Sequence, residues 1–326
     1  MKVISDVDKE MLTDDVIDML SKIGEVRFGP FSDDEFLREV DRTDAIFLES
    51  TVIDERVLRA APRLRIVARY GVGYDNVDVE ACTRRGVYVT ITRGVLSEAV
   101  ADLTLTFMLC LSRKLIGMNR YTREVWAERG EFLKLGSDLK QKVCGIIGLG
   151  QIGFEVAKRV HAFGMRILYH DVVRNERAEE LLSSRLVELD ELLRESDYVT
   201  VHVFLDERTR GMIGRRELSL MKESAYLINT ARGAVIDQSV LTEFLKENRI
   251  AGAGLDVFEE EPIPSDDPLL KLSNVVLTPH VGASTRETKD AMALSAIRNI
   301  SVALRGEVPP DLVPQQRGKV FRKSSV

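Results

Sequence analysis

Short apolar runs alternate with amphipathic stretches along nearly the whole chain. Between the early runs, DDEFLREV (33–40) and DERVLRAA (54–61) carry apolar residues at helical spacing. Strands that alternate with helices are typical of α/β proteins with parallel sheets. The early strand-like runs lie at residues 2–5, 45–48, 65–69 and 87–91.

The same alternation starts a second time at residue 142. A chain of 326 residues is long for one domain, so the two series predict two domains, each with its own sheet. The later strand-like runs lie at residues 142–147, 165–170, 198–203, 225–230, 252–256 and 274–277.

A long helix is predicted at residues 96–115, and it is unusually apolar for its length. Such a helix needs burial on several sides, so we expect it to pack against another domain or a second subunit. The last predicted helix spans residues 285–305. The polar tail that follows, residues 306–326, is expected to fray.

Composition narrows the class of protein. The 44% hydrophobic and 30% charged fractions are those of a soluble globular protein, and the net charge of −6 disfavours nucleic acid or an anionic membrane as the main partner. No apolar run is long enough to span a bilayer, and the N-terminus carries acids where a signal peptide needs an apolar core. The scattered Cys82, Cys110 and Cys144 form no disulfide framework, which predicts a reducing cytoplasm.

The most specific local motif is CGIIGLGQIGFEVAKRVHAFG (144–164), in which three glycines follow a strand and open a helix. Gly148 would permit the tight turn, Gly150 would let the backbone approach a pyrophosphate, and Gly153 would let helix and strand pack closely. The N–H groups and dipole at the helix N-terminus suit phosphate. The motif therefore predicts a dinucleotide site.

Asp171 ends the next strand, 18 residues after Gly153, near the position of the acid that binds a ribose. Its carboxylate would accept from the 2′-hydroxyl and repel a 2′-phosphate, which favours NAD over NADP. Arg174 is close enough in sequence to weaken that preference.

Three further residues with catalytic chemistry follow strands of the second series. Arg232 and His280 each come just past a strand, and Glu261 stands five residues beyond a strand end at Asp256. Ligands bind beyond the carboxyl ends of parallel strands, so these groups should converge. A guanidinium can clamp a carboxylate, and a histidine beside a carboxylate can protonate the oxygen of a ketone as hydride arrives.

Each of these residues alone has a plainer explanation. Arg232 could form a surface ion pair, Glu261 could belong to a solvated acidic loop, and His280 could cap a strand. The other histidines, His161, His170 and His202, form no cluster with metal-ligand spacing, so no metal is expected. Arg232, Glu261 and His280 follow the glycine motif along the chain in this order, and the combination favours hydride transfer as the reaction.

At this point the chain resembles the D-isomer-specific 2-hydroxyacid dehydrogenases over almost its whole length. That family includes phosphoglycerate dehydrogenase, glyoxylate and hydroxypyruvate reductases, D-lactate dehydrogenase, phosphite dehydrogenase and the C-terminal-binding-protein corepressors. The matching segments are ARYGVGYDNVD (68–78), LSEAVADL (96–103), VCGIIGLGQIG (143–153), NTARGAVID (229–237), GAGLDVFEEEP (252–262) and TPHVGAST (278–285).

The resemblance implies a fold and a set of site residues. It implies a flavodoxin-like substrate domain at residues 1–95 and 285–326, an NAD-binding Rossmann domain at residues 96–284, and a homodimer with the long helix at its interface. Arg232, Glu261 and His280 match the catalytic groups, and Gly71, Val72, Gly73 and Arg232 match the substrate-binding groups. The cofactor-binding positions are Gly148, Gly150, Gln151, Ile152, Gly153, Asp171, Phe204, Thr230, Ala231, Arg232, Asp256, His280 and Gly282.

Departures from the family pattern bear on the substrate. Leu48 stands where phosphoglycerate dehydrogenases usually carry an arginine for phosphate, and the adjacent Glu49 adds negative charge. Val72 replaces the lysine of phosphite dehydrogenase, and Arg93 replaces a common proline and could project toward the substrate. These features favour an NAD-dependent enzyme acting on a small D-2-hydroxy acid and its 2-keto acid. Phosphoglycerate dehydrogenase and glyoxylate or hydroxypyruvate reductase remain open, as does a corepressor-like NAD(H)-binding protein.

Overall fold

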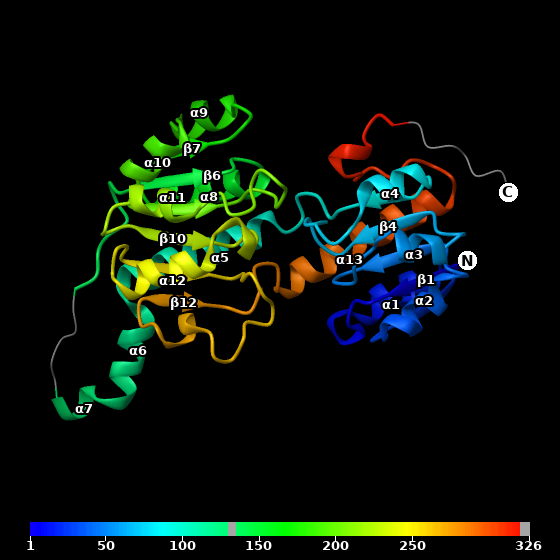
Figure 1. Cartoon of the computed structure of the whole chain (residues 1–326), viewed down its shortest axis with the longest axis horizontal. Coiled ribbons are helices and arrows are strands. Elements are labelled where there is room, and N and C mark those ends of the chain that lie inside the picture. The colour runs from blue at the N-terminus through cyan, green and yellow to red at the C-terminus, as the bar shows by residue number, and fades with distance from the viewer. Residues whose placement is uncertain (130–134, 320–326) are drawn as a thin grey trace. The chain divides into compact units, whose positions relative to one another are not determined.

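The computed structural model describes residues 1–129 and 135–319, and the chain divides into two compact units. Unit 1 comprises Met1–Leu96 and Ala283–Val326, and unit 2 comprises Ser97–Gly282. Each unit has a parallel sheet with helices packed against it (Figure 1). The predicted α/β class with two parallel sheets is confirmed.

Unit 1 is built on five parallel strands in the order β2-β1-β3-β4-β5. This is the flavodoxin-like order, whose topological switch point lies between β1 and β3. The strands are β1 (Lys2–Ser5), β2 (Glu25–Phe28), β3 (Ala45–Leu48), β4 (Ile66–Arg69) and β5 (Tyr88–Thr90).

The helices of unit 1 pack through buried side chains against its sheet and against one another. α2 buries Phe36 and Val40 while its first turn is acidic, and Ser32 caps it by accepting from the Glu35 N–H. The helices are α1 (Asp14–Ser21), α2 (Asp33–Val40), α3 (Glu55–Ala60), α4 (Val79–Arg84) and α13 (Arg286–Leu304), with 3₁₀ turns η1 (Lys9–Met11) and η4 (Pro314–Gln316).

Residues 306–319, which follow α13, include buried and hydrogen-bonded groups, so the prediction of a fraying tail is wrong for these residues. Val313 and Gln316 are fully buried. Gln316 accepts from the Val89 N–H and donates to the Val87 carbonyl, so its amide takes the place of another strand beside β5. Buried backbone groups must be paired, and this side chain pairs them. Residues 320–326 lie outside the described residues.

Unit 2 is built on seven parallel strands in the order β12-β11-β10-β9-β6-β7-β8. The order reverses direction between β6 and β9, which is the switch point of a doubly wound sheet. The strands are β6 (Val143–Ile147), β7 (Arg166–His170), β8 (Arg185–Leu186), β9 (Tyr198–Val201), β10 (Tyr226–Asn229), β11 (Gly252–Leu255) and β12 (Val275–Leu277).

Two hydrophobic cores in unit 2 correspond to the two faces of its sheet. One joins the sheet to α10, α11 and α12, and the other joins it to α5, α8 and α9. The helices are α5 (Ser97–Arg113), α6 (Leu115–Glu124), α7 (Trp126–Arg129), α8 (Gln151–Ala162), α9 (Glu176–Leu182), α10 (Leu189–Glu195), α11 (Arg215–Leu220) and α12 (Gln238–Lys246), with 3₁₀ turns η2 (Gly233–Val235) and η3 (Pro268–Lys271).

The long apolar helix predicted at residues 96–115 is shorter than expected. α5 ends at Arg113, and Lys114 adopts a left-handed conformation with φ of 50° before α6 begins. A left-handed residue interrupts helical hydrogen bonding, so the chain changes direction there. α6 and α7 then project away from the sheet of unit 2 (Figure 1). Among the described helices, none is long and apolar enough to cross a membrane.

The edge strands β2 and β8 were not predicted. β2 has exposed residues at every second position, and β8 has only two residues, so neither carries a buried apolar run. Their pairing with β1 and β7 is a tertiary contact that the local pattern does not encode.

Candidate active site

The turn between β6 and α8 has three glycines with different steric demands. Gly148 has φ of 92°, and a Cβ there would lie 2.9 Å from the carbonyl of His202, at the end of β9. A Cβ on Gly153 would lie 2.1 Å from the Gly148 oxygen, so this glycine permits α8 to pack on the turn. Around Gly150 nothing lies within 4 Å of a Cβ, which leaves open space at the helix N-terminus.

This open space suits the pyrophosphate of a dinucleotide. Gly150 is the N-cap of α8, and no described side chain caps the first-turn N–H groups. Those groups and the helix dipole favour an anion. Asp171 follows β7, where its Oδ2 accepts from the Leu149 N–H at 2.6 Å. The acid that suits the ribose is therefore bonded to the turn that suits the phosphates.

The turn after β10 presents Arg232 and is held by the strand's last residue. The buried Asn229 side chain accepts from the Ala231 N–H at 3.0 Å and donates to the Arg232 carbonyl at 2.9 Å. The Asn229 side chain thus bonds backbone groups of the turn, in place of the strand–strand hydrogen bonds that stop at residue 229. Thr230, in the same turn, is bonded through its hydroxyl to the Thr104 hydroxyl of α5 at 3.1 Å.

Gly233 lets this turn lie directly against the segment after β11. A Cβ at Gly233 would lie 1.9 Å from the carbonyl carbon of Phe258 and 2.4 Å from the Glu259 nitrogen. Only glycine permits such backbone contact without a shift of the chain. This approach brings Arg232 close enough for its charge to act on Glu261.

Asp256 organises the turn that carries His280. Its buried carboxylate accepts from the N–H groups of Val281 and Gly282, both at 2.8 Å, and from the Thr278 hydroxyl at 2.5 Å. Its carbonyl accepts from the His280 N–H at 2.8 Å. These bonds surround a histidine with φ of 53°, a conformation that is uncommon outside glycine and needs such support.

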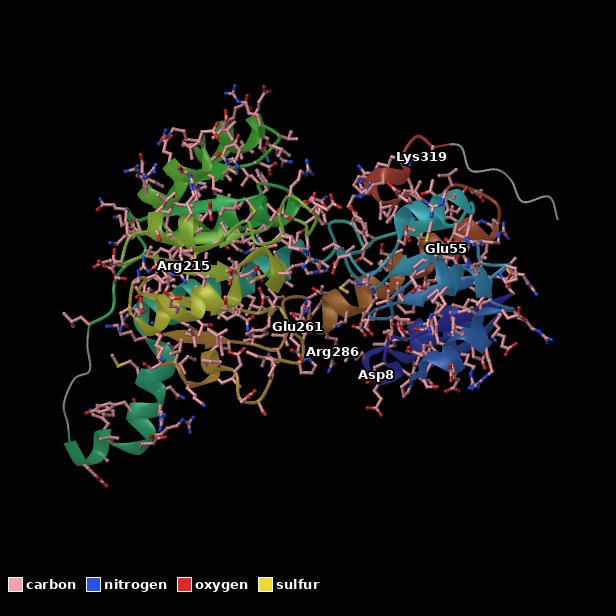
Figure 2. The ribbon with its side chains drawn as sticks, in the orientation of Figure 1. Asp8, Glu55, Arg215, Glu261, Arg286 and Lys319 are labelled. Atoms are coloured by element: carbon pink, nitrogen blue, oxygen red, sulfur yellow. The ribbon has the colours of Figure 1, made fainter. Side chains whose placement is uncertain are left out.

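Glu261 and His280 form a hydrogen-bonded pair, with 2.7 Å between the Glu261 Oε2 and the His280 Nδ1. Glu261 lies on the loop that follows β11 (Figure 2), and its other oxygen accepts from the Phe258 N–H. Burial favours the neutral acid, but the His280 bond, the Phe258 N–H and the Arg232 charge outweigh it and lower the pKa of Glu261. Glu261 is therefore an anion at neutral pH.

Unit 2 carries every predicted cofactor residue near the C-terminal ends of its strands. Gln151 and Ile152 begin α8, Phe204 follows β9 and is 54% exposed, and Gly282 ends the His280 turn with the Asp256 Oδ2 3.1 Å from a Cβ position. Gly71, Val72 and Gly73 lie in unit 1, just after β4. There the Gly71 carbonyl accepts from the Thr92 N–H, and the Gly73 carbonyl accepts from the Arg69 Nε.

The arrangement in unit 2 has the parts that a dinucleotide-dependent dehydrogenase needs. A glycine turn and helix N-terminus suit the phosphates of a dinucleotide, and Asp171 suits its ribose. An imidazole paired with a carboxylate can exchange a proton, and a guanidinium beside them can hold an anionic substrate.

Comparison with known proteins defines the family. The model of the D-isomer specific 2-hydroxyacid dehydrogenase NAD-binding domain matches residues 105–282. A glyoxylate reductase of Korarchaeum cryptofilum is 48% identical over 295 residues, which cover 90% of this chain and 89% of that protein. A glyoxylate reductase of Thermococcus gammatolerans is 47% identical over 315 residues, with 93% and 94% covered. The crystal structure of a glyoxylate reductase from Paecilomyes thermophila has a TM-score of 0.88 at 31% identity and covers 97% of this chain and 99% of that one.

The chain belongs to the D-isomer-specific 2-hydroxyacid dehydrogenase family. It is an NAD-linked oxidoreductase that interconverts 2-hydroxy acids and 2-keto acids. This result favours the predicted enzyme over the corepressor-like alternative.

Two positioning residues were not among the predicted site residues. Asn229 and Gly233 were quoted within the motif NTARGAVID but were given no role. An asparagine that ends a strand is a known signal for a local backbone turn, so Asn229 could have been found. Gly233 could not, because its steric demand comes from Phe258, which is remote in sequence.

We predict that Gly233→Ala impairs both folding and catalysis. The new methyl group must displace the Phe258 backbone, at a cost of about 1–3 kcal/mol, and the shift separates Arg232 from Glu261. Denaturant unfolding and kcat/KM measure the two effects. Gly214→Ala is the matched control, because its Cβ would meet no atom closer than 3.6 Å. Equal behaviour of the two variants would refute the steric role of Gly233.

Proposed function

We propose that the protein reduces glyoxylate, or a similarly small unphosphorylated 2-keto acid, with NADH. The observation that carries this proposal is the hydrogen bond of 2.7 Å between Glu261 and His280. The charge of Arg232 also acts on this pair, because it helps to lower the pKa of Glu261. The names of its relatives, which are glyoxylate reductases at 41–48% identity, support the choice of substrate.

In this proposal His280 is the proton donor. Its Nδ1 is committed to Glu261, so the proton passes from Nε2 to the substrate oxygen. When bound, NADH supplies the hydride that reduces the keto carbon. The keto acid gains one hydride and one proton and becomes the hydroxy acid, and in the reverse direction Nε2 takes the proton back. The Glu261 carboxylate pairs with Nδ1 and so fixes the orientation of the ring that carries Nε2.

Arg232 is proposed as a substrate-binding residue of unit 2, and the loop Gly71–Gly73 as a substrate-binding segment of unit 1. The guanidinium of Arg232 suits a carboxylate together with the adjacent keto oxygen. In the loop, the Gly71 carbonyl is bonded to the Thr92 N–H, so the trans peptide directs the Val72 N–H away from Thr92. That N–H is proposed to bind the substrate carboxylate.

The end of β3 in unit 1 is poorly suited to a substrate phosphate. The N–H groups of Glu49, Ser50 and Thr51 would be natural anion ligands, but the Asp6 carboxylate accepts from all three at 2.6–2.9 Å. Leu48 is fully buried in the hydrophobic core of unit 1, so it offers no polar contact.

The nearby cations of unit 1 are also engaged. Lys289 lies 3.6 Å from the Glu49 carboxylate and 4.9 Å from the Tyr70 ring. Arg69 is buried and donates to the carbonyls of Gly73, Leu48 and Glu49, so it shapes the loop and the end of β3 together. Arg93 donates to the Leu312 carbonyl at 3.0 Å. These contacts support an unphosphorylated substrate.

We predict that glyoxylate and hydroxypyruvate are reduced with NADH at a kcat/KM at least about tenfold above that for phosphohydroxypyruvate. A factor of ten needs only about 1.4 kcal/mol, which is less than the cost of an unpaired phosphate beside Asp6. Steady-state rates of NADH oxidation with the three acids test this. Preference for the phosphorylated acid would contradict the proposed substrate class, and the absence of turnover with any 2-keto acid would contradict the proposed function.

The roles of His280 and Glu261 predict different kinetic defects. His280→Ala should lower kcat by about 10²–10⁴ while NADH still binds, because the acid is lost and the phosphate turn is not. Glu261→Gln should lower kcat by a smaller factor, because the imidazole remains but loses its charged partner at Nδ1. Steady-state rates of NADH oxidation and NADH fluorescence titration measure both. A folded His280→Ala with near-normal kcat at pH 7 would remove His280 from the mechanism.

We also propose that the protein is a homodimer in a reducing compartment such as the cytoplasm. Leu115 and Ile116 on α6 and Trp126 on α7 are each more than half exposed, and α6 has no buried residue. Large apolar side chains grouped on one projecting segment favour a subunit contact. Cys82, Cys110 and Cys144 are all buried free thiols, which supports the compartment.

We predict that Ile116→Glu weakens the dimer. A buried carboxylate without a partner would be costly in such a contact. Sedimentation velocity over a range of protein concentrations should give a dimer for the wild type and a shift toward monomer for the variant. Leu270→Glu, at another exposed apolar position of unit 2, should leave the distribution unchanged. A monomeric wild type would contradict this part of the proposal.

A further inference from the structure

Arg174 is held by a single carboxylate beside the ribose-binding acid. Its Nε lies 3.0 Å and 3.1 Å from the two Glu179 oxygens, and its terminal nitrogen donates to Glu179 Oε2 at 2.7 Å. Arg174 stands three residues beyond Asp171, in the loop between β7 and α9. The cation that could bind a 2′-phosphate is therefore occupied by a fork of hydrogen bonds.

The Glu179 carboxylate is itself anchored in the core of unit 2. Tyr169 in β7 is fully buried, and its hydroxyl donates to Glu179 Oε1 at 2.6 Å. The same hydroxyl accepts from the Asn175 N–H at 3.0 Å. The Glu179 side chain is only 20% exposed, whereas that of Arg174 is 64% exposed. The acid is thus the fixed partner, and the arginine is the one that could move.

The surroundings of this loop offer little else to an extra phosphate. Arg177, the other arginine of the segment RNER, stacks on the Phe154 ring of α8 at 5.0 Å. The Asn175 side chain donates to the Leu149 carbonyl, which ties the loop to the phosphate turn. The region near the ribose site thus carries the carboxylates of Asp171 and Glu179, the charge of Glu176 also acts on Arg174, and both arginines have partners.

We propose that Glu179 is a specificity-determining residue that excludes NADP by holding Arg174 in the Tyr169–Glu179–Arg174 chain. Glu179 acts as a positioning residue, because it works through Arg174. NAD needs no cation at this place, since its 2′-hydroxyl can donate to Asp171. NADP needs one, and it obtains Arg174 only by breaking the fork and leaving the Glu179 carboxylate unpaired beside its phosphate. The inference concerns cofactor choice and does not depend on the proposed keto acid.

The test measures binding of NAD⁺ and NADP⁺ to the whole protein by isothermal titration calorimetry, without substrate. Glu179→Gln should raise the affinity for NADP⁺ by about five- to tenfold, as expected when a charge-assisted bond becomes available, and should change that for NAD⁺ less than about twofold. Arg174→Gln alone should leave the ratio of the two affinities near the wild-type value, because Arg174 is already engaged.

The double variant Glu179→Gln/Arg174→Gln separates the release of Arg174 from the simple loss of a negative charge. It should cancel the gain in NADP⁺ affinity. A gain that survives in the double variant would overturn the role of Arg174 and point to charge removal or to Arg177. Unchanged NADP⁺ affinity in Glu179→Gln would overturn the proposal outright.

Two further variants control the experiment. Glu191→Gln breaks the Arg185–Glu191 pair of 2.7 Å in the same unit and should leave the affinity ratio unchanged. Tyr169→Phe keeps the ring in the core and removes one bond to Glu179, so it should give a smaller gain of the same sign. If Glu179→Gln does not fold, as judged by circular dichroism, Tyr169→Phe carries the test, and its failure to raise NADP⁺ affinity would overturn the proposal.

Discussion

The buried carboxylate of Asp256 is the group on which the catalytic geometry of unit 2 depends. It follows β11 directly and accepts three hydrogen bonds from the turn after β12. A buried carboxylate needs such partners, and the turn needs acceptors for N–H groups that no strand pairs. The hydrogen bonds between Asp256 and the turn satisfy both requirements. They hold His280 at a positive φ, where its Nδ1 is hydrogen-bonded to Glu261. Family resemblance assigns Asp256 to the cofactor, and its contacts within unit 2 show in addition that it holds the turn of His280, the proposed proton donor.

Three other charged side chains form hydrogen bonds with neighbouring groups that could otherwise contact a ligand. Asp6 occupies the N–H groups after β3, Arg69 occupies the carbonyls around the Gly71–Gly73 loop, and Glu179 occupies Arg174. In each case a group that could bind a phosphate, or change the shape of a loop, is already bonded within its own unit. The proposed selectivity against phosphorylated ligands rests on these hydrogen bonds, because a new anion must first break them.

The sequence pattern pointed to residues with catalytic chemistry, but it did not reveal several elements of the fold. The glycine turn, Asp171, Arg232, Glu261 and His280 were predicted as site residues because each stands at a recognisable distance from a strand, and strand ends in a parallel sheet share one edge. The extent of α5, the edge strands β2 and β8 and the buried groups after α13 were not predicted. Each depends on a partner remote in sequence: the burial of Gln316, for example, depends on strand β5, more than 220 residues earlier.

The sequence by itself determined the α/β class and the two sheets, and it predicted a dinucleotide turn and a set of catalytic groups, because these follow from local periodicity and from spacing along one strand or turn. Only the tertiary structure decided which groups are available to a ligand. Leu48 reads as a candidate specificity position but lies in the core, and Arg174 reads as a candidate phosphate ligand but is held by Glu179. Availability depends on burial and on hydrogen-bond partners, and both are set by the packing of the folded chain.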